Sequence, residues 1–153
     1  MTAANVKLSV GTTISVSAGP TAAETAVGYE ALTFTDIGEV INIGESGGNA
    51  QITPFTPVDS GVVNKRKGSI DYGTLALQIA KDAADAGQVI LKAGFDGAAR
   101  DTIHSFKIVD GSGDTFYFMG IISSFTTARG DANTIISHNC NVERTSVTII
   151  DPA

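Results

Sequence analysis

The sequence has no tryptophan, only one cysteine and few charged side chains. Charged residues make up 17% of the 153 residues, whereas an ordinary soluble domain has roughly 25%. Because Cys140 stands alone, a disulfide framework and a multi-cysteine zinc site are both excluded, and a reducing compartment suits the chain. A surface this poor in charge indicates that part of it is covered in the working state, and another subunit is the simplest cover.

The charge that is present is mostly acidic, with a net value of −6. A protein that grips nucleic acid needs clustered Lys and Arg to neutralise phosphates, so this composition argues against that class. The only run of basic residues is Lys65-Arg66-Lys67. This run suits contact with phosphates or with acidic groups of a partner as well as it suits a solvated strand end, and both interpretations stay open.

Long apolar runs are also missing. No stretch approaches the roughly 18 apolar residues of a membrane span. The N-terminal residues 1–5 (MTAAN) show no basic region followed by an apolar stretch, as a secretory signal would. We therefore expect neither a membrane anchor nor a cleaved signal peptide.

What the sequence does contain is alternation with a period of two. Leu75, Leu77 and Ile79 fall on one face of an extended segment, which predicts a strand with one buried side. Similar patterns, separated by turn residues, predict strands at 12–17, 37–43, 62–67, 70–80, 102–109, 115–126 and 134–150. We expect the 62–67 and 70–80 strands to pair around a turn at 67–69, and the 102–109 and 115–126 strands around a turn at 110–114.

One helix is predicted. Asp82 is a suitable N-cap for the apolar stripe that follows it, and Gly94 is placed to end the helix. Residues 22–32 are interrupted by Val27-Gly28, so we expect at most a short helical turn there. The predicted fold class is mainly β with one helix (α+β), in a single domain over residues 1–153.

The segment from about residue 44 to residue 61 predicts a flexible arm, either a long loop or an open hairpin. It has few apolar anchors. Its candidate contact residues are Gly44, Gly47, Gly48, Pro54, Pro57 and Gly61. Connections of this length are uncommon inside a compact domain and are usually functional or disordered.

The residues that could support catalysis are few. His138 and Cys140 are two apart on a predicted strand and face the same side, so a thiolate activated by histidine is conceivable. No local signature surrounds them and no third orienting group is evident. We therefore favour two residues that share one face of a strand, and we predict no catalytic residues.

Metal and adhesion motifs are equally weak. Asp110 and Asp114, with Asp96 and Asp101 nearby in the sequence, could offer oxygen ligands to calcium, but the spacing lacks the EF-hand pattern and hairpin turns favour Asp in any case. The tripeptide Arg129-Gly130-Asp131 is a known adhesion motif that also recurs by chance in turns. We predict no metal and no cofactor, and we do not expect an enzyme.

Three stretches carry a resemblance that runs through most of the chain: residues 18–45, 65–94 and 106–125. They contain the segments GYEAL, IGEV, KGSIDYG and DAGQ, and the combination is more specific than any one of them. In this combination the chain resembles the major tail tube protein of long-tailed, non-contractile (siphophage-type) bacteriophages. The resemblance implies a β-sandwich or barrel-like domain flanked by a helix.

The resemblance also implies a structural virion protein and a set of partners. Subunits would close into hexameric rings, which stack around a tape measure protein and form a channel for DNA ejection into the host. Further implied partners are the tail tip or baseplate and the tail terminator, with assembly in the bacterial cytoplasm and final location in the virion. DNA would pass through the lumen without specific binding.

Two expectations about particular residues follow from that picture. The 44–61 segment is expected to reach an adjacent ring and to become ordered on contact. An acidic wall would repel the duplex within about a Debye length, roughly 8 Å at physiological salt, instead of holding it. Asp59, Asp71 and Glu143 are the candidate lumen acids, because they lie on or beside predicted strands.

Three alternatives remain open at this point. One is a type VI secretion-like tube, a contractile-tail tube or a related ring such as a tail terminator, because these share the implied fold. Another is a carbohydrate-binding β-sandwich, which the absence of Trp and the 7% aromatic content disfavour. The last is a hydrolase that uses His138 and Cys140.

Overall fold

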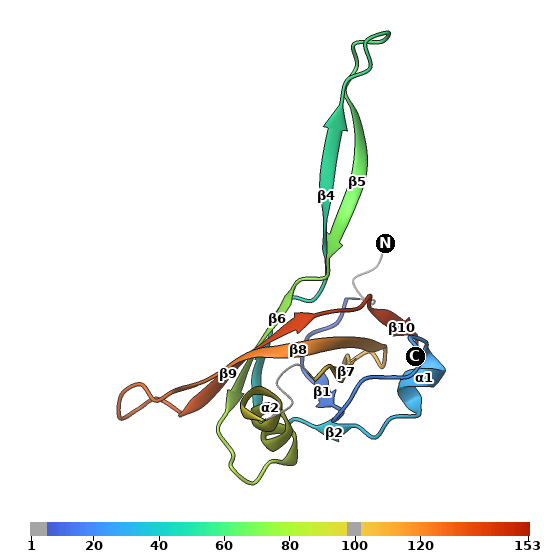
Figure 1. The fold of residues 1–153 in the computed structure, drawn as a ribbon. Coiled ribbons are helices and arrows are strands. Elements are labelled where there is room, and N and C mark those ends of the chain that lie inside the picture. The colour runs from blue at the N-terminus through green and yellow to red at the C-terminus, as the bar shows by residue number, and fades with distance from the viewer. Residues whose placement is uncertain (1–5, 98–101) are drawn as a thin grey trace.

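The computed structural model describes residues 6–97 and 102–153, and strands are its main regular element (Figure 1). The strands are β1 (Thr13–Val16), β2 (Thr35–Asp36), β3 (Val40–Ile43), β4 (Asn49–Phe55), β5 (Asn64–Asp71), β6 (Thr74–Ala80), β7 (His104–Val109), β8 (Thr115–Ala128), β9 (Ser137–Arg144) and β10 (Ile149–Asp151). The helices are α1 (Ala26–Glu30) and α2 (Ala86–Asp96). The mainly β class is confirmed.

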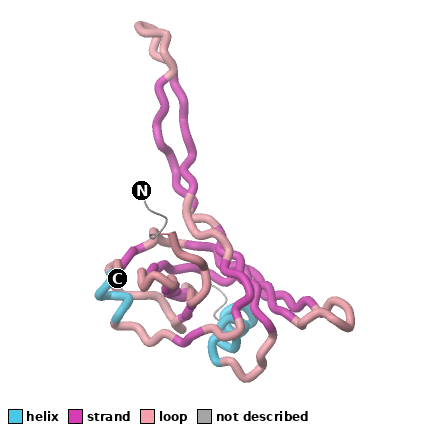
Figure 2. Tube along the Cα trace, turned by 180° about the vertical axis from the view of Figure 1, so that it is seen from behind, coloured by secondary structure: helices cyan, strands magenta, loops and turns pink. Residues whose placement is uncertain are grey.

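The body of the molecule is one antiparallel sheet that curls around a core. Its order is β2-β1-β7-β8-β9-β6-β3, and β10 pairs with β8. The long strand β8 pairs with β7 over residues 115–120 and with β9 over residues 120–128. Because β7 and β9 pair with different parts of β8, the strands before β8 and those after it are offset along this strand. These two parts of the curved sheet face each other in a sandwich-like way (Figure 2). Among the described strands β2 and β3 end this order and β10 has β8 as its single partner, so these three strands keep open edges.

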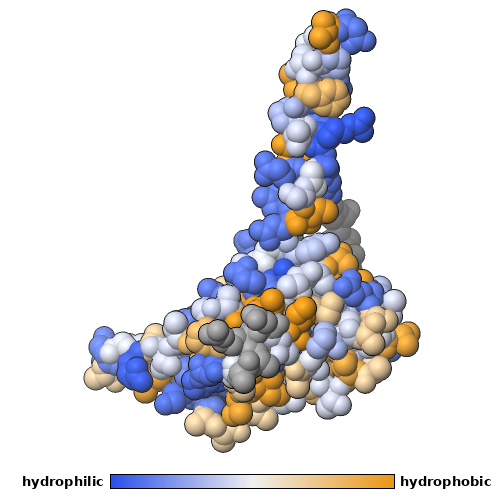
Figure 3. Space-filling model, in the orientation of Figure 1, coloured by the Kyte–Doolittle hydropathy of each residue, from blue (hydrophilic) through white to orange (hydrophobic). Residues whose placement is uncertain are grey.

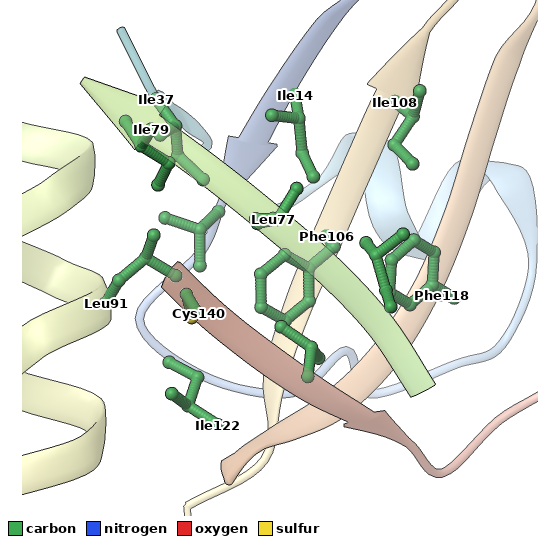
Figure 4. Packing of buried hydrophobic residues seen from close by; sticks show 13 residues of the cluster. Ile14, Ile37, Leu77, Ile79, Leu91, Phe106, Ile108, Phe118, Ile122 and Cys140 are labelled. Atoms are coloured by element: carbon green, nitrogen blue, oxygen red, sulfur yellow. The ribbon is translucent and has the colours of Figure 1, made fainter. Parts of the chain in front are cut away.

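The core fills the concave side of this sheet (Figure 4). It is built by alternate residues of the central strands, as the period-two pattern predicts: Leu75, Leu77 and Ile79 are all buried. Helix α2 packs against the curved sheet and contributes Leu91 to the core. A smaller cluster lies on the outer side, where Tyr29 of α1 stacks on Tyr117 with ring centroids 5.1 Å apart. The short helical turn expected within 22–32 is therefore present as α1.

The predicted ends of the second helix were wrong. The N-cap is Asp85, whose Oδ2 accepts the Gln88 N–H at 2.9 Å, while Asp82 only closes a local turn with the Ala84 N–H. Gly94 does not end the helix, which continues to Asp96. Gly94 is buried, and a Cβ added there would lie 2.6 Å from the His104 Nε2 atom. This glycine allows close packing of α2 on the sheet, a role that differs from C-capping.

The predicted pairing of strands 62–67 and 70–80 was also wrong. Strand β5 continues through Lys67-Gly68-Ser69 to Asp71 and pairs with β4. The chain turns instead at Gly73, whose φ of 80° falls in the left-handed region.

The predicted final strand, 134–150, is divided into β9 and β10. Between them the Ser146 Oγ accepts the Met119 N–H at 2.8 Å, and the Arg144 guanidinium donates to the Tyr72 and Ser146 carbonyls and to Thr148 Oγ1. These contacts hold the irregular segment 145–148 against β8.

Candidate assembly surfaces

A two-stranded hairpin, β4–β5, projects from the body (Figures 1 and 2). We call residues 48–72 the hairpin arm. Every residue of β5 is exposed, and in β4 only Ala50 is partly buried. Gly44 and Gly47 lie at its foot, where the Gly44 N–H donates to the Ala76 carbonyl at 2.9 Å. The other four predicted contact residues lie within it: Gly48, Pro54, Pro57 and Gly61.

The charge of the hairpin arm differs in sign from that of the body. Lys65, Arg66 and Lys67 lie opposite Pro54, Thr53 and Ile52, respectively, in the β4–β5 register. The arm has three basic and two acidic residues, so its net charge is +1, and the remainder of the chain carries −7. Electrostatics therefore favours contact between the arm of one copy and the body of another.

The tip of the arm is a closed turn with an apolar apex. The Gly61 N–H donates to the Pro57 carbonyl at 3.0 Å, and Gly61 has a φ of 64°. The proline ring restricts the backbone at the start of this turn, and glycine can adopt the positive φ at its end, so we expect the turn to have little conformational freedom. Val58 is fully exposed at the apex and Asp59 follows it. Figure 3 shows hydrophilic and hydrophobic residues side by side along the arm, with a hydrophobic one at the tip.

A cavity of about 330 Å³ lies beside α2, which we call the α2 pocket. Its lining comes from the loop before α2, from α2 itself and from the ends of β8 and β9: Lys81, Asp82, Ala83, Gln88, Val89, Lys92, Phe125, Thr127 and His138. The His138 ring packs on Phe125 with centroids 4.7 Å apart, and its Nδ1 lies 3.0 Å from Thr127 Oγ1. Burial lowers the pKa of His138, and the neighbouring Lys81, Lys92 and Arg129 lower that pKa further.

The three candidate lumen acids do not lie together. Asp71 and Glu143 are at the same end of β6: the Asp71 Oδ1 accepts the Gly73 N–H at 2.9 Å, and the Glu143 Oε2 accepts the Thr74 hydroxyl at 2.7 Å. Asp59 is at the tip of the hairpin arm. All three carboxylates are exposed.

Cys140 is part of the core. Its side chain is fully buried, and this burial raises the pKa of the thiol to about 12. A thiol with that pKa stays protonated at neutral pH, so it lacks the thiolate that a nucleophile needs. This agrees with our preference for a packing role of His138 and Cys140 over a catalytic one.

Of the aspartates singled out in the sequence, Asp96 ends helix α2 and pairs with Lys92, while Asp110, Asp114 and Asp131 lie in turns. The Asp110 N–H donates to the Asp114 carbonyl at 2.9 Å, and the Asp131 carboxylate accepts the Asn133 N–H at 3.0 Å and the Thr134 hydroxyl at 2.8 Å. Asp101 lies outside the described residues. Within residues 6–97 and 102–153 there is no group of three or more His, Cys, Asp or Glu side chains that could hold a metal ion. In the same ranges no helix is long and apolar enough to span a membrane.

No known protein family and no curated protein sequence matches the chain, but solved structures do. One is the tail of an empty gene transfer agent particle with C6 symmetry, which is 17% identical with a TM-score of 0.59; the match covers 77% of this chain and 86% of the tail subunit. The SPP1 tail tube is 10% identical with a TM-score of 0.60, covering 93% and 77%. A sheath/tube terminator of the PVC extracellular contractile injection system is 11% identical with a TM-score of 0.65, covering 97% and 99%.

These matches extend over most of the chain while the sequences have diverged. At such identities they establish the fold and leave the role to be argued separately. The mainly β fold that the sequence resemblance implies is therefore confirmed: the chain has the fold of the subunits that build phage tail tubes and of those that terminate related tubes.

Proposed function

We propose that the chain is the major subunit of a phage tail tube of the non-contractile type, which polymerises as stacked hexameric rings. The observation that carries the proposal is the hairpin arm, an ordered hairpin whose strands bury almost nothing within their own chain. An isolated two-stranded hairpin is marginally stable at best in water. A second copy that covers the arm would supply the missing burial. The C6 symmetry of the similar gene transfer agent tail supports six subunits per ring.

Ring closure requires one surface of a copy to meet a different surface of the next. The open edges β2 and β3 offer unpaired backbone groups at the two ends of the sheet. Edges of this kind promote uncontrolled association unless they are covered. In a ring they would be covered by neighbouring subunits, and the charge-poor surface would be buried with them.

The acidic character of the body suits a conduit for DNA. A wall that carries carboxylates repels the duplex at short range, whereas a basic wall would release counterions and retain it. Asp71, at the foot of the hairpin arm, and Glu143, on the body, are the acids we propose for this wall, since both are exposed and lie at the same end of β6. Replacing both by Lys is expected to leave tubes intact and to slow DNA ejection. Unchanged ejection by tubes with the reversed charges would contradict this part of the proposal.

The proposed partners are the ones that such a tube needs. They are a tape measure protein inside the tube, a tip or baseplate at one end and a terminator at the other, with assembly in the bacterial cytoplasm and incorporation into the virion. The similarity to a PVC tube terminator and to the baseplate of the anti-feeding prophage supports this setting.

Contractile-type tubes are the main alternative. One similar structure is a PVC sheath-tube complex, with a TM-score of 0.60, and a terminator also shares the fold. The fold alone does not separate these roles, but the product of assembly does. A tube subunit forms long stacks, a terminator stops at one ring, and a contractile-type tube binds a sheath protein on its outside.

Negative-stain electron microscopy of the concentrated, purified chain tests the proposal directly. We expect long hollow tubes with six subunits visible in end views. Isolated rings would support a terminator instead. A chain that remains monomeric at high concentration, even after short tube fragments are added as seeds, would refute the proposed role.

A further inference from the structure

The hairpin arm and the α2 pocket lie at opposite ends of strand β6. Strand β6 starts at Thr74, directly after the arm, and ends at Ala80, directly before Lys81 of the pocket. Figure 1 shows the arm rising from one end of the body, while α2 and the loop before it lie at the other. Identical rings that stack with one polarity bring opposite ends of successive subunits together. The tip of one copy and the α2 pocket of another are therefore placed to meet.

The tip and the pocket match in polarity. Val58 is an exposed apolar side chain on a closed turn, and the pocket offers the exposed Val89 and the aromatic ring of Phe125. Docking a turn that is already closed costs little conformational entropy, so burial of these apolar side chains is retained as binding free energy.

The two surfaces also match in charge. Asp59 is the only acid of the tip. At the pocket, Lys92 pairs with Asp96, whereas Lys81 makes no ion pair within the described residues. Asp82 also lines the pocket, so the charge match rests on Lys81, the lining cation without an ion pair in the described part of the chain, which Asp59 would complement.

We propose that the tip of each hairpin arm, residues 57–61, seats in the α2 pocket of a copy in the adjacent ring, with Val58 against Phe125 and the Asp59 carboxylate beside the Lys81 ammonium. The inference rests on the proposed tube function and names the site where successive rings join. In this arrangement the Asp59 carboxylate lies at the junction between rings, whereas the sequence suggested that it faces the lumen.

Cysteine cross-linking of assembled tubes tests this contact. The double variant Val58→Cys, Val89→Cys places one thiol on the tip and one at the pocket, at two exposed positions. In the matched control Val58→Cys, Val27→Cys, the second thiol lies on α1, at a position that is more exposed (75% against 55% for Val89) and does not line the pocket. The native Cys140 is buried and does not compete.

Oxidised tubes of the Val58→Cys, Val89→Cys variant should give a ladder of covalent oligomers that continues beyond six subunits, because a junction between rings does not close. The control should stay monomeric on a denaturing gel. Three results would overturn the pocket assignment while leaving the tube function intact: tubes without cross-links, a ladder that ends at six, or an equal ladder in the control. Absence of tubes in the unmodified protein would overturn the tube function itself.

A charge swap tests the ion pair. Asp59→Lys and Lys81→Glu each place like charges at the junction, so we expect each to raise the critical concentration for assembly about tenfold or more, since the contact is repeated around the ring. The double variant restores opposite charges and should recover most of the loss. Lys7→Glu, on an exposed N-terminal residue, serves as the control. Single variants that assemble like the control, or a double variant no better than the singles, would refute the pairing.

Discussion

Removing the hairpin arm is expected to separate folding from assembly. The structure provides a natural junction, because the carbonyl oxygen of Gly47 lies only 2.5 Å from where a Cβ on Gly73 would be. Deleting residues 48–72 and joining Gly47 to Gly73 therefore closes the gap without stretching β3 or β6. Those strands stay antiparallel neighbours, with Ile43 opposite Leu77.

The expected effect on stability is small. The arm contributes no residue to either hydrophobic cluster, so no core burial is lost. The deletion does remove the Tyr72 carbonyl, one of the three acceptors of the Arg144 guanidinium, at a cost of about 1 kcal/mol. The connection between Gly44 and Ala76, which are joined by a backbone hydrogen bond, becomes shorter by the deleted residues. Loop-closure entropy then raises the free energy of unfolding by at most about 1.5 kcal/mol, and the lost Arg144–Tyr72 hydrogen bond offsets about 1 kcal/mol of this gain, so the net free energy of unfolding should be nearly unchanged. Stacking, in contrast, should be lost completely.

Urea denaturation of the full-length and the shortened protein measures the free energy of unfolding, and sedimentation with electron microscopy measures the stacking of rings. We expect the shortened chain to unfold at the same or a slightly higher urea midpoint and to yield rings or monomers without tubes. A loss of more than about 2 kcal/mol would show that the arm supports the core, contrary to its exposure. Tubes of normal length would show that the arm does not join the rings.

Three further predictions concern the body. Arg144→Met removes a buried guanidinium that stacks 4.7 Å from the Phe118 ring centroid and donates to three acceptors. The free energy of unfolding measured in urea should therefore fall by about 2–4 kcal/mol, whereas Arg66→Met on the exposed arm should leave it nearly unchanged. Because the Cys140 thiol pKa is raised to about 12, native protein at pH 8 should react with a maleimide at least about a hundredfold more slowly than urea-unfolded protein; equal rates would contradict the burial. Gly87→Ala would place a Cβ 2.5 Å from the backbone of β2, so thermal melting should show a loss of about 1–3 kcal/mol, and an unchanged melting temperature would contradict the close packing.

The body could be predicted well where one face of a strand is buried. Residues 74–80 alternate in the sequence because β6 is buried on one side only, and the β7–β8 hairpin follows from its turn at 110–114. The end of α2 could not be predicted in this way. Gly94 has the same local signature whether it ends a helix or lets it approach a sheet, and only the tertiary contact with His104 distinguishes the two.

The hairpin arm shows the limit of pattern reading more clearly. Both faces of β4 and β5 meet solvent in the single chain, so no alternation of buried and exposed residues sets their limits. The sequence predicted a strand at 62–67 and another from residue 70, which divides β5 at 67–69, and it did not mark β4 as a strand. The Pro and Gly content of residues 44–61 left a long loop and an open hairpin as alternatives, and backbone pairing between β4 and β5 shows that the hairpin is correct. The α2 pocket could not be found at all, because Lys81, Val89 and Phe125 come from separate elements that only the fold brings together.

The placement of tip and pocket also bears on how long a tube becomes. A contact between unlike ends of a subunit leaves free tips on one terminal ring and empty pockets on the other, so each added ring recreates the site for the next. Nothing in such a contact stops growth. Length must then be set by other components, which is the task that a tape measure protein and a terminator would perform. A terminator that shares this fold would also be able to occupy one end of the stack with the same type of surface, and it would stop addition there by lacking either the tip or the pocket.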